Sequence, residues 1–121
     1  MHRIWLFMGA VAGLTAVGLS AWAAHGAPST FAPAPRRAVD NALMIQGWHA
    51  FALIAAGLLA ERDRVFANLA GLAFAVGTVL FCGAVWWGVL GLRPLGLPIA
   101  PLGGVTLMIG WALLALAALR R

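Results

Sequence analysis

Residues 65–92 read VFANLAGLAFAVGTVLFCGAVWWGVLGL, a run of 28 residues without a charged side chain. Arg64 precedes this run, and Arg93-Pro94 closes it. A helix needs about 20 apolar residues to cross the hydrocarbon core of a bilayer, which is about 30 Å thick. The run is longer than that, so it predicts a transmembrane helix that either tilts or leaves the hydrocarbon before Arg93.

Three further apolar runs of spanning length lie on either side of this segment. They are rich in Ala, Leu and Gly and show no strict alternation of apolar and polar residues, which favours helices over a membrane β-barrel. The sequence therefore predicts an all-α fold, an integral membrane bundle of four transmembrane helices forming a single domain over residues 1–121. The expected helices are 4–24, 41–60, 65–92 and 99–119.

The composition indicates that lipid, not water, surrounds most of this chain. Hydrophobic residues make up 64% of it and charged residues 9%, whereas soluble domains carry about 25% charged residues. The net charge of +5 does not indicate nucleic-acid binding, because all eight basic residues are arginines at the ends of apolar runs. They form no stripe interleaved with aromatic residues. Cys82 is the sole cysteine, which excludes an intrachain disulfide.

The arginines also predict the orientation of the helices. Four crossings place both termini on one side of the membrane, and the side with more arginines is normally cytoplasmic. Five arginines accompany the termini and three lie on the opposite side, so we expect cytoplasmic termini. The five are Arg3, Arg62, Arg64, Arg120 and Arg121, and the three are Arg36, Arg37 and Arg93.

The first apolar run also has features of a cleavable signal peptide. Arg3 precedes it, and Ala21-Trp22-Ala23 imitates a cleavage site. The run is long for the hydrophobic region of a signal peptide, so we interpret it as a retained transmembrane helix.

The connections between the runs differ in length. Residues 25–39 contain three prolines and are predicted not to form a continuous helix. Residues 61–64 and 93–98 are short, so we expect tight turns between antiparallel neighbours.

The tryptophans and glycines suggest where the helices meet lipid and where they meet one another. Tryptophans near the run ends fit aromatic belts at the membrane boundaries, and those in mid-run are expected to pack inside the bundle. Small residues allow close approach of helix backbones, and a GxxxG pair could also serve a homo-oligomer. The expected belt is Trp5, Trp22, Trp86 and Trp87, the inner tryptophans are Trp48 and Trp111, and the packing glycines are Gly9, Gly13, Gly103, Gly104 and Gly110.

Three polar residues are candidates for a site. His49 is the one ionisable residue inside an apolar run, and such residues are costly in lipid and often functional. Gln46 lies three residues earlier and is expected on the same helix face. His25 is expected at the outer boundary. The structural alternative is that His49 and Gln46 bond a neighbouring helix and that His25 caps the first helix.

The sequence offers little support for a metal, a cofactor or a catalytic centre. Haem ligation by His25 and His49 requires similar depths, but their positions predict a gap of about 15 Å. A copper site of His49, Cys82 and Met44 or Met108 has suitable ligands, but no recognisable ligand spacing supports it. No Ser-His-Asp or zinc pattern is present, so we expect neither metal nor catalytic residues.

Several short motifs occur in a fixed order along almost the whole chain. Together they resemble the YgdD/YwdK-like family, also called transmembrane-protein-256-like, a group of small membrane proteins under a domain of unknown function. The resemblance implies four transmembrane helices and a bacterial inner-membrane or organellar location, and it implies no reaction. The motifs are Ala24-His25-Gly26, Gln46-x-x-His49-Ala50-x-Ala52-Leu53, Phe81-Cys82-Gly83, Pro101-Leu102-Gly103-Gly104 and Gly110-Trp111.

The chain departs from that family at the third-helix motif. The family usually has serines where this chain has Cys82 and Ala84, and a tyrosine where Trp86 stands. These departures weaken any function that needs a hydroxyl cluster or Cys82 as a ligand. The preferred interpretation is a non-enzymatic inner-membrane protein acting through helix contacts or as an accessory subunit. The alternative is a small-solute or ion pathway, or a cofactor or metal site, around His49 and Gln46.

Overall fold

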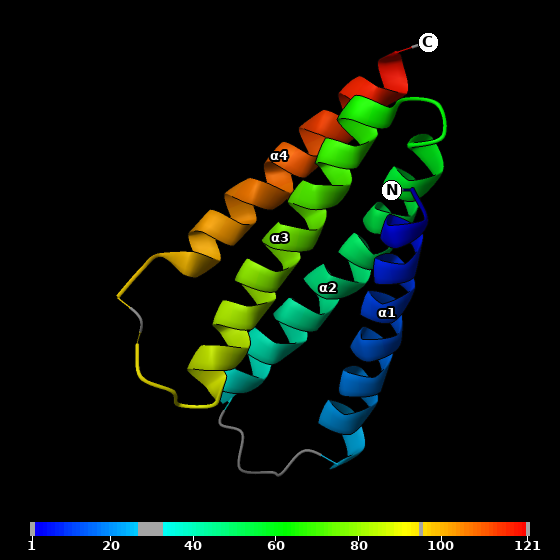
Figure 1. Cartoon of the computed structure of the whole chain (residues 1–121). Coiled ribbons are helices and arrows are strands. Elements are labelled where there is room, and N and C mark those ends of the chain that lie inside the picture. Colours follow the sequence, from blue (N-terminus) through cyan, green and yellow to red (C-terminus); the bar gives the residue numbers. More distant parts are fainter. Residues whose placement is uncertain (1, 27–32, 95, 121) are drawn as a thin grey trace.

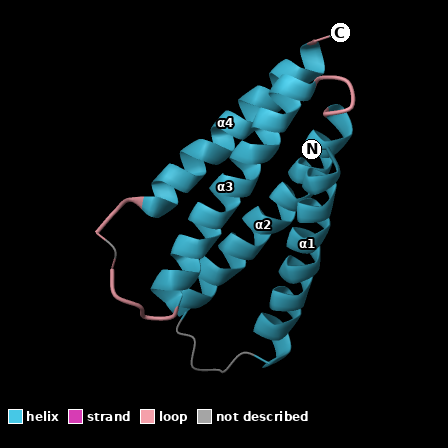
Figure 2. Ribbon diagram, viewed as in Figure 1, coloured by secondary structure: helices cyan, strands magenta, loops and turns pink. Residues whose placement is uncertain are grey.

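The computed structural model describes residues 2–26, 33–94 and 96–120. They form four α-helices, each long and apolar enough to cross a membrane, and a π-helical turn, Trp22–Gly26, that extends the first of them. These described ranges contain no strand, and the loops lie at the two ends of the molecule (Figure 2). The prediction of an all-α bundle of four transmembrane helices is confirmed. The helices are α1 (His2–Ala21), α2 (Pro33–Leu59), α3 (Arg64–Val89) and α4 (Ile99–Leu119).

The four helices lie side by side in the order of the chain (Figure 1). The main contacts join α1 to α2, α2 to α3, and α3 to α4. Within the described residues α1 and α4 make no contact, because they lie at opposite edges of the bundle. As a result, α2 and α3 are the most buried helices and α1 and α4 are more exposed to lipid.

The second helix begins earlier than the sequence analysis expects. The expected start is residue 41, but α2 begins at Pro33 and includes Pro35. Residues 33–39 are thus helical, whereas the prediction that residues 25–39 do not form one continuous helix is not tested, since residues 27–32 lie outside the described residues. Proline is compatible with the first turn of a helix, where the backbone N–H groups have no intrahelical partner.

The third helix ends earlier than expected, at Val89 and not at residue 92. Gly91 follows with a φ of 71°, a left-handed conformation that glycine adopts without steric cost. The Gly91 N–H donates to the Gly88 carbonyl and the Leu92 N–H to the Trp87 carbonyl. This is the hydrogen-bond pattern of a Schellman motif, which ends helices.

Glycines allow the closest helix contacts, mainly between α3 and α4. A Cβ atom added at Gly103 would lie 2.5 Å from the backbone nitrogen of Phe81, and one at Gly110 would lie 2.7 Å from the Phe74 ring. On α1, a Cβ at Gly9 would lie 2.7 Å from the Ala50 carbonyl oxygen, whereas Gly13 has more room. Gly104 faces open space, so the expectation of close packing is wrong there.

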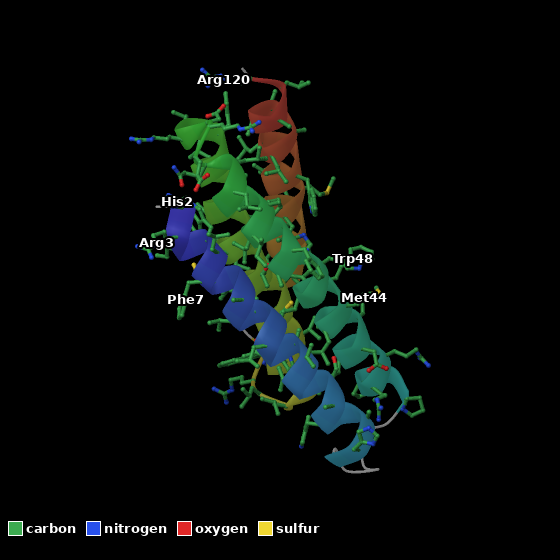
Figure 3. All side chains as sticks on the ribbon, turned by 90° about the vertical axis from the view of Figure 1, so that its right-hand side faces the viewer. His2, Arg3, Phe7, Met44, Trp48 and Arg120 are labelled. Atoms are coloured by element: carbon green, nitrogen blue, oxygen red, sulfur yellow. The ribbon has the colours of Figure 1, made fainter. Side chains whose placement is uncertain are left out.

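Some tryptophans differ from expectation in their exposure: Trp5 is buried and Trp48 is exposed. Trp5 is 4% exposed, so it is not part of a boundary belt. Its Nε1 donates to Asn68 Oδ1 at 2.7 Å, and its ring covers Gly71. Trp48 is 57% exposed and points away from the bundle (Figure 3), so the expectation of an inner position is wrong. Trp111, the other tryptophan expected inside, is also largely exposed, at 46%. These helices are apolar on every side, so sequence periodicity does not show which face is inside.

Candidate functional site

His49 is enclosed between α2, α3 and α4. The side chain is 4% exposed. Its Nδ1 lies 2.7 Å from the Ile45 carbonyl oxygen, one turn earlier on α2, and Trp111 Nε1 donates to its Nε2 at 3.0 Å. An indole nitrogen can only donate, so Nε2 must accept and Nδ1 must carry the proton. Both nitrogens of the neutral ring therefore have partners.

Aromatic rings fill the space around this imidazole. The ring centroids of Phe74 and Trp111 lie 5.7 and 5.8 Å from that of His49, and 5.1 Å from each other. The two edge-to-face pairs that include Trp111 have a favourable aromatic geometry. We call His49, Phe74 and Trp111 the His49 cluster. Its packing leaves the imidazole no free lone pair for a metal, and no open side toward a solute.

Gln46 contacts a different helix. Its Nε2 donates to the Ala12 carbonyl at 3.0 Å and to Thr15 Oγ1 at 2.8 Å, both on α1. Gln46 and His49, expected on one helix face, therefore bond different neighbouring helices. Side chains three residues apart point in directions that differ by about 60° around the helix axis. On α2 this difference directs Gln46 toward α1 and His49 toward α4.

The remaining candidate ligands are not brought together with His49. His25 is exposed in the π-helical turn that extends α1. Cys82 is buried, and its thiol donates to the Ala42 carbonyl at 3.4 Å. Met44 and Met108 are both exposed. No group of three or more His, Cys, Asp or Glu side chains suited to a metal occurs among the described residues.

A groove lies between α1, α2 and α3. It has a volume of about 440 Å³, and most of its wall is apolar. Polar groups reach it from Thr15, Gln46, Thr78 and Cys82. The hydroxyl of Thr78 is buried and has no hydrogen-bond partner in the part of the chain that the structure describes. We call this hollow the α1–α3 groove.

The α1–α3 groove was not predicted from the sequence. On α3 its wall includes Ala75, Val79 and Gly83, which are spaced by four residues and so share one helix face. Their small size is the signal that could have indicated it. Several other stripes of small residues occur in these helices, so this signal identifies a groove only once the neighbouring helices are known.

Charged side chains collect at the end of the bundle that holds both chain termini, which we call the terminal end (Figure 3). Asp63 caps α3 by accepting from the N–H groups of Val65 and Phe66. Its other oxygen lies 3.6 Å from Arg120 Nε, and the Arg120 guanidinium lies 5.0 Å above the Phe66 ring. The end of α4 is thus attached to the start of α3.

Comparison with known proteins identifies relatives over almost the whole chain. Residues 19–104 match the family described as "Protein of unknown function (DUF423)". A UPF0382 membrane protein of Staphylococcus epidermidis is 31% identical and covers 98% of this chain and 97% of its own length. A UPF0382 membrane protein of Haemophilus influenzae is 32% identical over 95% of this chain and 93% of its own length.

A third relative has a location in its name. The UPF0382 inner membrane protein YgdD of Escherichia coli K12 is 29% identical over 98% of this chain and 91% of its own length. No solved structure matches the chain at a significant level. The relatives agree with the resemblance found in the sequence motifs, and none of their names states a reaction.

Proposed function

This chain belongs to the DUF423 family of small membrane proteins, and from that premise we propose that it is a non-enzymatic accessory subunit of the bacterial inner membrane. It would act by binding a transmembrane helix of another membrane protein. The inner-membrane location is supported by the name of the Escherichia coli relative.

The α1–α3 groove is the observation that carries this proposal. Between helices in lipid, association depends on close packing and on a few hydrogen bonds, because lipid tails are as apolar as the side chains. The groove provides small residues for close packing. A helix seated there would fill the volume.

The polar residues of α2 do not favour the alternative, a solute pathway or cofactor site. His49 has partners on both ring nitrogens, and both contacts of the Gln46 amide nitrogen are with α1. His49 therefore offers no free group to a solute, and Gln46, which borders the α1–α3 groove, binds α1 through its amide nitrogen. The aromatic rings around His49 support a structural role for that residue.

A photo-crosslinking amino acid at Val79, inside the α1–α3 groove, tests the proposal in living cells. Met108 on α4 is the control position, because it is exposed to lipid and lies at a similar depth to Val79. The neighbour of Met108, Leu107, packs against Gly77, which is two residues before Val79. We expect an adduct with one other membrane protein from Val79, no such adduct from Met108, and a weaker adduct after Gly83→Leu fills the groove. Equal adducts at both positions, or an adduct of two copies of this chain, would contradict the proposal.

We also propose that both termini face the cytoplasm. The support is the excess of arginines at the terminal end, since cytoplasmic ends of membrane helices normally carry more of them. Alkaline phosphatase fused after Arg121 should be inactive, and green fluorescent protein fused there should be fluorescent. The opposite pair of results would reverse the proposed orientation.

A further inference from the structure

A recess at the terminal end lies outside the α1–α3 groove. It has a volume of about 450 Å³ and is lined mainly by polar side chains of α1, α3 and the turn between α2 and α3. His2 and Arg3 lie at the same end of the molecule as Arg120 (Figure 3). The lining residues are His2, Ala60, Glu61, Arg64 and Asn68.

Arg64 brings a positive charge to this recess and makes no ion pair with any described residue. Of the two acidic residues of this end, Asp63 pairs with Arg120 at 3.6 Å. Glu61 lines the same recess and lies 3.9 Å from His2 Nε2, so one carboxylate accompanies the Arg64 guanidinium there. Arg3 and Arg62 are also exposed at this end and likewise have no acidic partner among the described residues.

An apolar hollow of about 310 Å³ adjoins the recess. Arg64 and Asn68 line both spaces, so one continuous surface changes from polar to apolar as it passes down α3. Its apolar wall is formed by Trp5, Val65, Leu69 and Leu72.

The floor shared by the two spaces is held in place by hydrogen bonds. Asn68 accepts from Trp5 Nε1 and donates through Nδ2 to the Arg64 carbonyl. The Trp5 ring is fixed in turn against Gly71, where a Cβ atom would lie 2.6 Å from the ring. The shape of this surface therefore depends on packed groups of α1 and α3, not on mobile side chains alone.

We propose that this surface binds an anionic phospholipid, with the phosphate beside Arg64 in the recess and part of an acyl chain in the adjoining hollow. A guanidinium binds phosphate oxygens well, because its N–H groups match their geometry. The position also fits, since the ends of transmembrane helices lie at the depth of the headgroups and attract anionic lipids. Glu61 at the recess favours a headgroup with a single negative charge, because a second charge would increase the repulsion.

The test uses the purified full-length chain in a mild non-ionic detergent. Dioleoyl-phosphatidylglycerol is added, with dioleoyl-phosphatidylcholine as the neutral lipid, and the thermal midpoint is measured by loss of helical circular dichroism. We expect phosphatidylglycerol to raise the midpoint several degrees more than phosphatidylcholine. Arg64→Gln should remove most of that difference, whereas Arg62→Gln, which changes an exposed arginine outside the recess, should retain it. Lipid-free midpoints show whether either variant impairs folding.

A second variant separates lipid binding from binding of a free anion. Leu72→Trp should fill part of the hollow and weaken the response to phosphatidylglycerol, and inorganic phosphate at the same concentration should not raise the midpoint of the wild-type chain. Three results would overturn the proposal: equal responses to the two lipids, equal losses in Arg62→Gln and Arg64→Gln, or a response to inorganic phosphate as large as that to the lipid.

Discussion

The two sides of α2 surround a polar residue in different ways. Toward α4, His49 is enclosed by Phe74 and Trp111, and both of its nitrogens have partners. Toward α1, Gln46 also has partners, but it borders a groove of about 440 Å³. We call these the closed side and the open side of α2.

The difference between the two sides comes from the sizes of neighbouring residues on α3. The fully buried Phe74 ring fills the closed side, whereas Ala75, Val79 and Gly83 border the open side. Phe74 and Ala75 are consecutive, so a rotation of about 100° around α3 separates a filled space from a hollow one. A polar residue in a transmembrane helix therefore indicates a site only when the facing helix leaves it room.

The largest expected effect is on the α3–α4 contact that supports the closed side. Gly103→Ala would place a methyl group 2.5 Å from the backbone nitrogen of Phe81, and backbone atoms cannot move aside without shifting a helix. We expect a loss of about 2–3 kcal/mol in the free energy of unfolding, measured by denaturation in mixed micelles.

Gly104→Ala is the matched control for that variant. It changes the next residue of the same helix, and that residue faces open space. The free energy of unfolding of this variant should therefore equal or slightly exceed that of the wild type. Equal destabilisation by the two variants would show that α4 packs on α3 through a different face.

The next effect concerns the hydrogen bond inside the His49 cluster. Trp111→Phe keeps an aromatic ring but removes the donor to His49 Nε2, which leaves that nitrogen buried without a partner. We expect a loss of about 1 kcal/mol in the same unfolding measurement. Trp48→Phe on the exposed face of α2 is the control and should have little effect. An unchanged stability of Trp111→Phe would mean that water or another group reaches His49.

A smaller effect is expected on the open side. Gln46→Leu removes two contacts to α1 but leaves no buried group without a partner, because the Thr15 hydroxyl still donates to the Val11 and Ala12 carbonyls. We therefore expect a loss below about 1 kcal/mol. Thr15→Val removes only one of the two contacts and should cost less. If Gln46→Leu destabilised the protein more than Trp111→Phe does, the open side would contribute more to stability than the closed side, contrary to this comparison.

The smallest effect on stability should come from filling the α1–α3 groove itself. Gly83→Leu points into open space, since no atom lies within 4 Å of its added Cβ. We expect a thermal midpoint within about 2 °C of the wild type, because the change is far from the tight contacts. A Cβ atom added at Gly77, six residues earlier, would lie 2.7 Å from the Leu107 side chain, so Gly77→Leu should lower the midpoint clearly. A strong loss in Gly83→Leu would show that the groove is closed in the folded protein.

The sequence predicted the number of helices well because run length alone decides whether a segment can cross a bilayer. It predicted faces poorly, because an apolar helix has no polar side to mark its exterior. Trp5 and Trp48 illustrate this: one is buried against Gly71 and the other is exposed, although their positions along the runs suggested the reverse.

The burial of His49 inside the bundle was predicted, and the side chain is 4% exposed. Its partner Trp111 lies 62 positions away on another helix, and no local pattern in the sequence identifies it. The α1–α3 groove was not predicted at all, since it depends on the sizes of residues from three helices brought together.

The arrangement of the helices in chain order has a consequence for synthesis. The main interfaces join helices that are consecutive in the chain, so the fold has a low contact order for its size. Each helix after the first finds its principal partner already inserted when it leaves the ribosome, and contacts between distant segments, such as that of Trp111 with His49, form later. The Arg120–Asp63 pair is then among the last contacts to form, when the carboxyl end of the finished chain joins the turn between α2 and α3.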